Sequence, residues 1–478
     1  KCEFYNNLYS KQGKMTVKAR KVAQDLEDIS PNHTEAVIDL CKEEKICPYY
    51  MSLFLTKNSK VIVTDYFYLF NNNIRDSFLS RIGKELSKSI VIVDEAHNLP
   101  SRVRDLMSEQ INSYVVAQAV KEAEKLGHEE LVIILNSVKE ILDNLATTIR
   151  EGNETMIIKQ AFKNQVDELG DYFQIIADLE DVADEVRQSK KRSFIGSVAD
   201  FLEAWNGPDE GFARILRVRK SKEDVVELSY KCLDPALVTR EVFNESYSSV
   251  LMSGTLTPIE MYKDLLGLSD DCLLESFPSP FPEENKLSLI IPSVTTKYNK
   301  RSEDQFKRIA SICAETTDST PGNSVVFFPS YELLNRVNHY FQYTCKKTVF
   351  LEQPGMTKQD KSELLENFKQ YKDSGAVLMS VISGSFGEGI DLPGDYLKTV
   401  VVVGLPLQTP NLETKALIDY YGQKFGDGWY YGYVYPAFNK TLQSAGRCIR
   451  SETDRGVVLF LDERYLWPNY FKCFPEAA

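Results

Sequence analysis

The sequence lacks any long apolar run, any low-complexity tract and any dense group of cysteines. No segment approaches the roughly 18 uninterrupted apolar residues of a transmembrane helix, so we expect no membrane span. The 9 cysteines are an odd number spread along 478 residues, which argues against a disulfide scaffold and for a reducing, intracellular setting. The start of the sequence has neither an initiator Met nor an apolar signal core, so we expect a cytoplasmic protein, or a nuclear one in a eukaryote.

The chain has fewer positive than negative charges. Lys and Arg number 56 against 69 Asp and Glu, and a formal net charge of −13 would normally count against a nucleic-acid partner. Most of this excess lies in residues 121–190, so the total does not describe the rest of the surface. An apolar share of 43% over this length predicts a globular protein of several domains.

Short β-branched and apolar runs alternate with helix-like segments in the sequence. Continuous apolar runs are typical of strands buried on both faces, and their alternation with helices predicts parallel sheets covered by helices. The expected strands are residues 61–63, 90–93, 250–252, 289–291, 325–328, 377–379, 400–403 and 457–461. The clearest expected helices are residues 301–316, 331–341 and 359–371.

A polar, acidic segment separates the expected strands into two groups. Its apolar residues recur at helical spacing, as in Leu131, Leu135 and Val138, so we predict a mainly helical insertion. The insertion ends in a basic segment, residues 214–222, and the Pro-rich stretch 277–282 is expected to be a hinge. The two groups of strands therefore predict two sheet domains.

Two adjacent carboxylates, Asp94 and Glu95, follow the expected strand 90–93. At the end of a buried strand, this pair suits nucleotide hydrolysis: Asp94 can hold the water shell of Mg²⁺, and Glu95 can deprotonate the attacking water. The alternative is that the two acids only begin a helix, where negative charge is favoured. The apolar strand before them and His97 after them favour the catalytic interpretation.

Two arginines and an amide form the second candidate cluster. Gln443, Arg447 and Arg450 are spaced i, i+4 and i+7, so on a helix all three would share one side. Guanidinium groups placed together suit a phosphate that develops charge, although a solvated basic face is the alternative. Two further loops, residues 253–257 and 384–391, are rich in glycine or hydroxyl groups and follow strands, so their backbone could approach a ligand.

Together these strings resemble motifs II, III, V and VI of superfamily 2 helicases, and the whole chain is similar to the XPD-type iron–sulfur DNA helicases, the archaeal members in particular. The resemblance implies an α/β fold with two RecA-like parallel-sheet domains, the first with an iron–sulfur module and a mainly helical Arch insertion. The implied boundaries are residues 1–54 for the iron–sulfur module, 55–103 and 223–276 for helicase domain 1, 104–222 for the Arch and 277–478 for helicase domain 2.

The same resemblance implies function and partners. It implies an ATP-dependent, monomeric DNA helicase that moves 5′ to 3′ on single-stranded DNA, acts on fork or bubble DNA and works with repair proteins in nucleotide excision repair. ATP and Mg²⁺ would lie between the two sheet domains. Nucleotide-binding or catalytic roles are implied for Asp94, Glu95, His97, Gly387, Glu388, Gly389, Asp391, Gln443, Arg447 and Arg450. The alternatives are a DinG-like or RTEL-like helicase of another pathway and a non-catalytic DNA-binding scaffold.

Two features of the family, its iron–sulfur cluster and its phosphate loop, are only partly present or missing in this sequence. Cys2 and Cys47 resemble the third and fourth ligands of its [4Fe–4S] cluster, whereas Cys41 fits by spacing only. A phosphate loop of the form GxxxxGK[ST] is missing, since residues 12–16 lack the leading glycine and the preceding strand. The family carries this loop and two more cysteines upstream, so we expect further sequence before Lys1.

Single-stranded DNA needs cations and aromatic platforms. Trp429 is our stacking candidate, because Asp427-Gly428 before it and Gly432 after it predict a loop tip. The other aromatic residues of this region are more typical of a core. Asp462 and Arg464 follow the last strand, where loops commonly bind ligands, and we expect a phosphate contact there.

Overall fold

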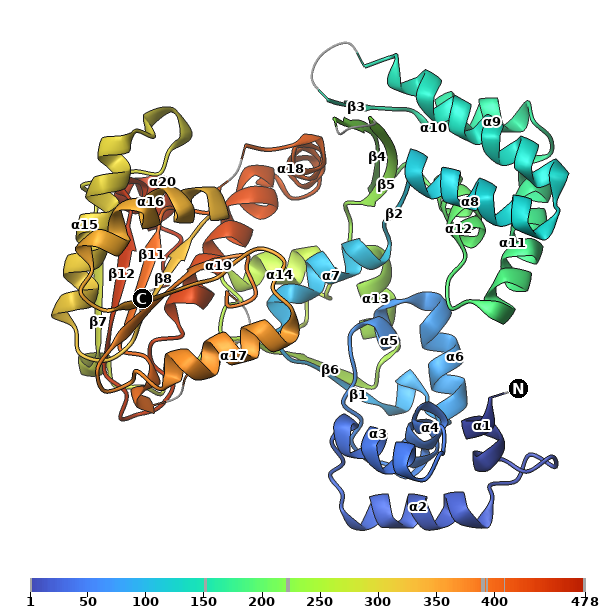
Figure 1. Cartoon of the computed structure of the whole chain (residues 1–478), viewed down its shortest axis with the longest axis horizontal. Helices are drawn as coiled ribbons and strands as arrows, with labels where there is room; N and C mark the ends of the chain where they lie inside the picture. The colour runs from blue at the N-terminus through green and yellow to red at the C-terminus, as the bar shows by residue number, and fades with distance from the viewer. Residues whose placement is uncertain are drawn as a thin grey trace. The chain divides into compact units, whose positions relative to one another are not determined.

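A computed structural model describes residues 2–149, 153–220, 224–387, 392, 394–407 and 409–475 (Figure 1). It divides into two compact units, which are described in turn. The first contains Lys1–Met107 and Pro235–Met252, and the second contains Ser108–Asp234 and Ser253–Ala478. No helix among the described residues is long and apolar enough to cross a membrane.

The first unit begins with a small helical body. Its helices are α1 (Glu3–Leu8), α2 (Val17–Asp28), α3 (Thr34–Glu43) and α4 (Pro48–Asn58). The hydroxyl of Thr16 caps α2 by accepting the amide of Ala19 at 3.1 Å. Leu26, Cys41 and Met51 from successive helices are fully buried together, so this body has its own apolar core.

The rest of the first unit is built around two parallel strands. β1 (Ile90–Val93) pairs with β6 (Ser248–Leu251), with Ile90 opposite Ser248. Val91 and Val93 are buried, but Ile90 and Ile92 are exposed, so one face of β1 is covered where the apolar run predicts two. The other elements are α5 (Phe67–Phe70), α6 (Asn72–Ile82), η1 (Leu86–Lys88), η2 (Ala96–Asn98), α7 (Leu99–Leu106) and α13 (Ala236–Glu245).

The strand predicted at residues 61–63 is wrong. This segment has no strand assignment and pairs with no strand of the described chain. Val61 and Val63 are both exposed, so their β-branched side chains do not pack on a sheet. A β-branched run favours extended backbone, but only hydrogen bonds to a neighbouring strand make it part of a sheet.

The second unit contains the predicted insertion, and it is mainly helical as expected. Its helices are α8 (Ser113–Leu126), α9 (Glu129–Ala146), α10 (Lys159–Asp167), α11 (Tyr172–Ser189) and α12 (Phe194–Trp205). They cover a four-stranded antiparallel sheet of order β2-β5-β4-β3, formed by β2 (Glu109–Asn112), β3 (Glu154–Met156), β4 (Phe212–Arg219) and β5 (Val225–Cys232). Most of the segment read as basic is strand β4, and its partner β5 extends the insertion beyond the boundary expected at 222 to Cys232.

A six-stranded, entirely parallel sheet of order β7-β12-β11-β8-β10-β9 follows in the second unit, which confirms the predicted α/β class. Its strands are β7 (Lys286–Ile291), β8 (Ser324–Phe328), β9 (Thr348–Leu351), β10 (Ala376–Val381), β11 (Thr399–Val403) and β12 (Gly456–Leu461). The three expected helices are present as α15 (Glu303–Ser319), α16 (Tyr331–Thr344) and α17 (Lys358–Lys369).

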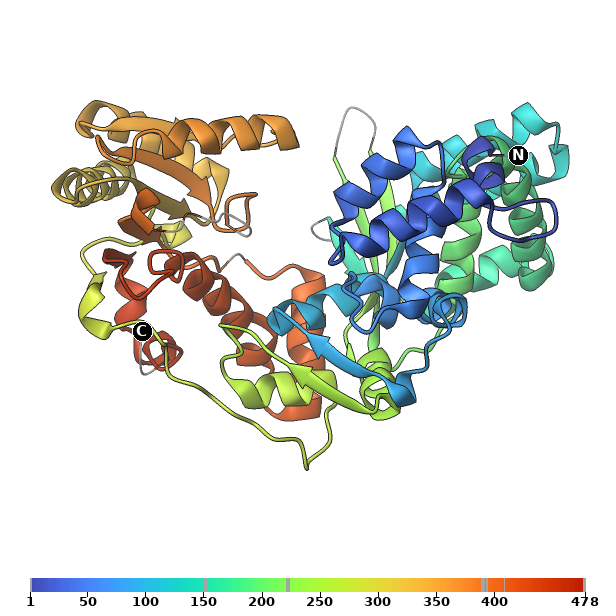
Figure 2. The same ribbon diagram turned by 90° about the horizontal axis from the view of Figure 1, so that it is seen from below.

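Helices cover both faces of this sheet (Figure 2). Val326 and Phe328 of β8 join the core under α15 and α16, whereas Val325 and Phe327 join the opposite core under α17 and α19 (Tyr435–Ala445). The remaining elements are α14 (Ile259–Leu266), η3 (Glu283–Asn285), η4 (Tyr298–Lys300), η5 (Gly394–Tyr396), α18 (Leu412–Phe425), η6 (Tyr430–Val434), η7 (Glu463–Leu466) and α20 (Pro468–Phe471).

Candidate functional site

The first candidate site is the turn that leaves β1. Met252 donates its amide to the Val93 carbonyl at 3.0 Å, and the Ala96 amide donates to the Met252 carbonyl at 3.0 Å. The turn is therefore fastened to the chain beyond β6 on both sides. Asp94 and Glu95 lie within it, are both exposed, and are linked by a hydrogen bond of 2.9 Å from the Glu95 amide to Asp94 Oδ1.

Glu95 has an unusual backbone conformation for its residue type. Its φ of 48° and ψ of 42° lie in the left-handed region, which costs a non-glycine residue about 1–2 kcal/mol. His97 Nδ1 lies 3.2 Å from Glu95 Oε2, and the His97 side chain is 7% exposed against 62% for Glu95. A buried imidazole thus contacts the carboxylate while water can still reach the carboxylate, as a general base requires.

Tyr66 completes this turn, and sequence reasoning missed it. Its hydroxyl lies 2.5 Å from the carbonyl oxygen of Asp94 and 3.1 Å from that of Glu95. Burial, and then the negative charges of Glu95 and Asp94, raise the pKa of Tyr66, so the hydroxyl keeps its proton and donates. The contact spans 28 residues of sequence, and no local pattern around Tyr66 predicts it.

The second candidate site is the loop after β10. A buried carboxylate, Glu352, holds its start and is 1% exposed. Glu352 accepts hydrogen bonds from the Ser380 hydroxyl at 2.6 Å, the Ser385 amide at 2.8 Å, the Tyr331 hydroxyl at 3.1 Å and the Val381 amide at 3.2 Å. Both carboxylate oxygens therefore have two donors each, which offsets the cost of burying the charge.

Two glycines of this loop have no room for a side chain. A Cβ at Gly384 would lie 2.6 Å from Glu352 Oε2, and a Cβ at Gly387 would collide with the carbonyl oxygen of Ile382. The predicted close approach of backbone is therefore to the protein itself at these two positions. The predicted ligand contacts Glu388, Gly389 and Asp391 lie outside the described residues.

Arg447 and Arg450 do not lie on the helix that the sequence predicts. Helix α19 ends at Ala445, so Arg447 and Arg450 follow it in a turn. The Asp454 carboxylate holds this turn by accepting the Arg450 amide at 2.8 Å, so the shared helix face with Gln443 is wrong.

The two arginine side chains also differ in environment. Arg447 is buried, and its Nε and Nη2 donate to the carbonyl oxygen of Gly387 at 3.1 and 2.5 Å, so it ties this turn to the loop after β10. Arg450 is exposed. Gln443, still on α19, lies 3.4 Å from the hydroxyl of Thr255 through its Nε2, which joins two of the predicted motifs.

Cys2 and Cys47, the cysteines predicted as cluster ligands, lie in neighbouring segments of the chain. Cys2 precedes α1 and Cys47 precedes α4, and the Cys47 amide donates to the Phe4 carbonyl at 3.1 Å. Cys41 lies in the apolar core, and burial, with a smaller effect of Cys47, raises the pKa of its thiol to about 11. Across the part of the chain that the structure describes, no group of three or more His, Cys, Asp or Glu side chains could hold a metal ion. Two thiols are fewer than the four thiolates that a [4Fe–4S] cluster needs.

Trp429 is exposed but does not lie at a loop tip. It is 45% exposed, its ring centroid lies 4.8 Å from that of Tyr433, and it precedes the π-helical turn η6. Gly428 explains the error, because a Cβ there would collide with the Ile418 carbonyl and lie 2.5 Å from the Gly422 amide. The glycine permits close packing against α18, and the chain is already helical at Trp429.

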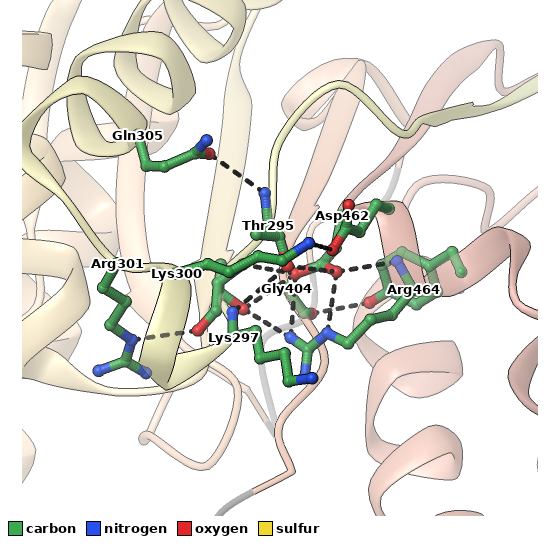
Figure 3. A network of polar contacts seen from close by, with 11 residues as sticks. Thr295, Lys297, Lys300, Arg301, Gln305, Gly404, Asp462 and Arg464 are labelled. Atoms are coloured by element: carbon green, nitrogen blue, oxygen red, sulfur yellow. Dashed lines mark hydrogen bonds and ion pairs between the residues drawn. The ribbon is translucent and has the colours of Figure 1, made fainter.

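Asp462 and Arg464 form a buried polar network (Figure 3), so Arg464 is paired with a carboxylate in this structure, and the phosphate contact expected at this position stays a prediction. They are 0% and 7% exposed. Asp462 accepts the Thr296 amide at 2.8 Å and Arg464 Nε at 2.9 Å, and Arg464 Nη2 donates to the Thr296 hydroxyl at 2.7 Å. Burial alone would raise the pKa of Asp462, but the hydrogen bonds and charge of Arg464 hold it below its usual value. The network fastens β12 to the segment after β7.

Comparison with known proteins finds similarity to helicases. Residues 313–478 match a family described as "Helicase C-terminal domain", and residues 1–116 match the family DEAD_2. The chain is 24% identical to the general transcription and DNA repair factor IIH helicase subunit XPD/RAD3 of Saccharomyces cerevisiae, covering 97% of this chain and 68% of that protein. It is 26% identical to the ATP-dependent DNA helicase XPD of Sulfolobus acidocaldarius, covering 90% of this chain and 75% of that protein.

A solved structure supports the fold as well. The chain superposes on an XPD helicase with a TM-score of 0.63 and 22% identity, over 98% of this chain and 83% of that one. At this identity the match concerns the fold, which agrees with the parallel sheets and the helical insertion described above.

Proposed function

We propose that this chain is an ATP-dependent DNA helicase of the XPD family, and that it couples ATP hydrolysis at Glu95 to movement 5′ to 3′ along single-stranded DNA, in repair of the nucleotide-excision type. The two XPD relatives are named as a DNA repair factor subunit and a DNA helicase, which supports this choice of substrate and process. Fork or bubble DNA and repair proteins are the partners we propose.

The turn after β1 is the observation that carries the proposal. Glu95 is exposed, its backbone is held in the left-handed region, and His97 contacts its carboxylate at 3.2 Å. A carboxylate so placed can accept the proton of an attacking water. Asp94 would hold Mg²⁺, because its side chain is exposed at a strand end; when bound, the ion neutralises phosphate charge.

The loop after β10 and the turn after α19 supply the second set of proposed nucleotide contacts. Arg450 is exposed and could reach a phosphate directly. Arg447 donates to the Gly387 carbonyl, so we propose that it both orients this loop and contacts nucleotide when the loop moves. Gln443, through Thr255, is proposed to connect this turn to the hydroxyl-rich loop after β6. Glu388, Gly389 and Asp391 remain proposed contacts on the family resemblance.

Two further proposals concern the cluster and DNA. Cys2 and Cys47 are proposed as two of four cluster ligands on the family resemblance, supported by the hydrogen bond from the Cys47 amide to the Phe4 carbonyl, which brings their two segments together. Trp429 is proposed to stack on a DNA base, because its ring is partly exposed and already backed by Tyr433.

Unwinding of tailed duplexes by the intact protein tests the proposal. Duplexes with a 5′ or a 3′ single-stranded tail are compared under the same ATP concentration. We expect only the 5′-tailed duplex to be unwound, and only with hydrolysable ATP. Unwinding of the 3′-tailed duplex alone would contradict the direction. DNA binding without unwinding or ATPase would instead support the non-catalytic scaffold.

A further inference from the structure

Tyr66 stands out among the polar groups outside the predicted motifs, because its side chain contacts the main chain of both proposed catalytic acids. We propose that Tyr66 is a positioning residue that keeps Glu95 in its left-handed conformation and so aims the Glu95 carboxylate. The inference rests on the proposed role of Glu95 as the base.

The ring of Tyr66 is itself fixed in place. Tyr66 immediately precedes α5, and the carboxylate of Asp65 accepts the Phe67 amide at 3.0 Å, which defines the start of this short helix. The Tyr66 ring packs edge-on against Phe70 at 6.4 Å, and Phe70 is buried against Phe243 of α13 at 5.7 Å. A ring held in this way delivers its hydroxyl to one position with little loss of side-chain entropy.

The hydrogen bonds of the Tyr66 hydroxyl depend on the backbone conformation of the turn. Two successive carbonyl oxygens, of Asp94 and Glu95, converge on it at 2.5 and 3.1 Å. In the observed left-handed backbone, with a φ of 48° at Glu95, both oxygens face the hydroxyl; a change to right-handed backbone would rotate the peptide that joins Asp94 and Glu95 and turn its oxygen away from Tyr66. The hydrogen bond therefore stabilises the conformation that is otherwise disfavoured for glutamate.

The backbone conformation of Glu95 determines where its carboxylate lies. In the left-handed turn, the Glu95 carboxylate lies beside His97 and is open to solvent. A general base must lie within hydrogen-bond reach of the proton it takes, and small displacements of such a group lower the rate of the chemical step more than they lower substrate affinity. Loss of the Tyr66 hydroxyl should therefore reduce kcat and leave the KM for ATP nearly unchanged.

The experiment is Tyr66→Phe in the intact protein, with Tyr68→Phe as the matched control. Tyr68 lies in α5 and its ring packs on Phe78 at 4.8 Å, but no hydrogen bond of its hydroxyl occurs among the described residues. We expect kcat for DNA-stimulated ATPase to fall about threefold to tenfold in Tyr66→Phe, the equivalent of one hydrogen bond, with KM for ATP within about twofold. Amide hydrogen exchange of residues 94–98 should accelerate in Tyr66→Phe alone.

Each other result overturns the inference. Unchanged kcat in Tyr66→Phe shows that the hydroxyl does not position the base, whatever the exchange rates. A fall in kcat accompanied by an equal rise in KM, or by the same change in Tyr68→Phe, shows a general effect on folding. A Glu95→Gln variant, made in parallel, separates this inference from the proposed function: if it keeps turnover, the proposed function fails, whereas if it is inactive and Tyr66→Phe is normal, only the role of Tyr66 fails.

Discussion

Replacing Glu352 by Gln should loosen the loop after β10 without changing the size of the side chain. Glu352 offers two oxygens, each of which accepts two hydrogen bonds from neutral donors. A Gln amide offers one oxygen and one NH₂ group, and in either orientation the NH₂ faces two donors. One of these two donors is a hydroxyl, of Ser380 or Tyr331, which can turn and accept from the NH₂ group, whereas the other is a main-chain amide, of Val381 or Ser385, which cannot. One hydrogen bond is therefore lost and one main-chain amide is left without an acceptor.

The magnitude follows from that count. An unsatisfied buried donor costs about 1–3 kcal/mol. Removing the buried negative charge offsets part of this cost. We therefore expect a net loss of about 1–2 kcal/mol in the local stability of β10 and the loop that follows it.

Native-state hydrogen exchange measures this local quantity, which is the right one because a chain of several units has no single free energy of unfolding. Peptides covering residues 376–387 are followed in Glu352→Gln and in the control Glu363→Gln, since Glu363 is exposed on α17. The control should change by less than about 0.5 kcal/mol. A Glu352→Gln variant that exchanges like the parent would refute the view that this carboxylate holds the loop.

Three further predictions concern the proposed site residues in the intact protein. Gly387→Ala must displace the loop, because its Cβ would collide with a main-chain carbonyl and Arg447 would lose its acceptor; DNA-stimulated ATPase should fall about 100-fold, and a fall below about twofold would contradict this. Cys47→Ser should lower the iron content and remove the visible absorbance of the cluster, whereas Cys41→Ser should leave both unchanged, so that iron loss in the second variant would show the ligand choice to be wrong. Trp429→Ala should weaken single-stranded DNA binding by about 1–3 kcal/mol with an unchanged melting temperature, and a lowered melting temperature with normal affinity would assign the ring to the core.

Strands that are buried on both faces, and helices with a local sequence signal, could be predicted from the sequence. The run 325–328 is apolar throughout because β8 is central in a parallel sheet and is covered on both faces, and the residues at 331–341 begin a helix for equally local reasons. The strands of the insertion could not be recognised in this way. β4 carries Arg214 and Arg217, whose charges are neutralised by Asp209 and Glu154, so a strand with paired arginines resembles a basic loop in the sequence.

In the candidate site, too, local signals could be predicted and contacts between distant residues could not. The position of Asp94 and Glu95 directly after a strand could be predicted, because the apolar run before them is a local signal. The errors at Arg450 and Trp429 arose where the course of the backbone depends on distant atoms: the Asp454 carboxylate holds the turn after α19, and α18 packs against Gly428. Tyr66 could not be found because its role is a contact between separate segments.

The measurement that tests the account most directly is the DNA-stimulated ATPase of Glu95→Gln in the intact protein. The amide keeps the shape of the carboxylate but cannot accept a proton, so we predict a fall of about 10²–10⁴ in kcat. Affinities for DNA and for ATP should stay within about twofold of the parent, about 0.4 kcal/mol. Turnover within a few-fold of the parent would show that Glu95 is not the base and would contradict the proposed function of this turn.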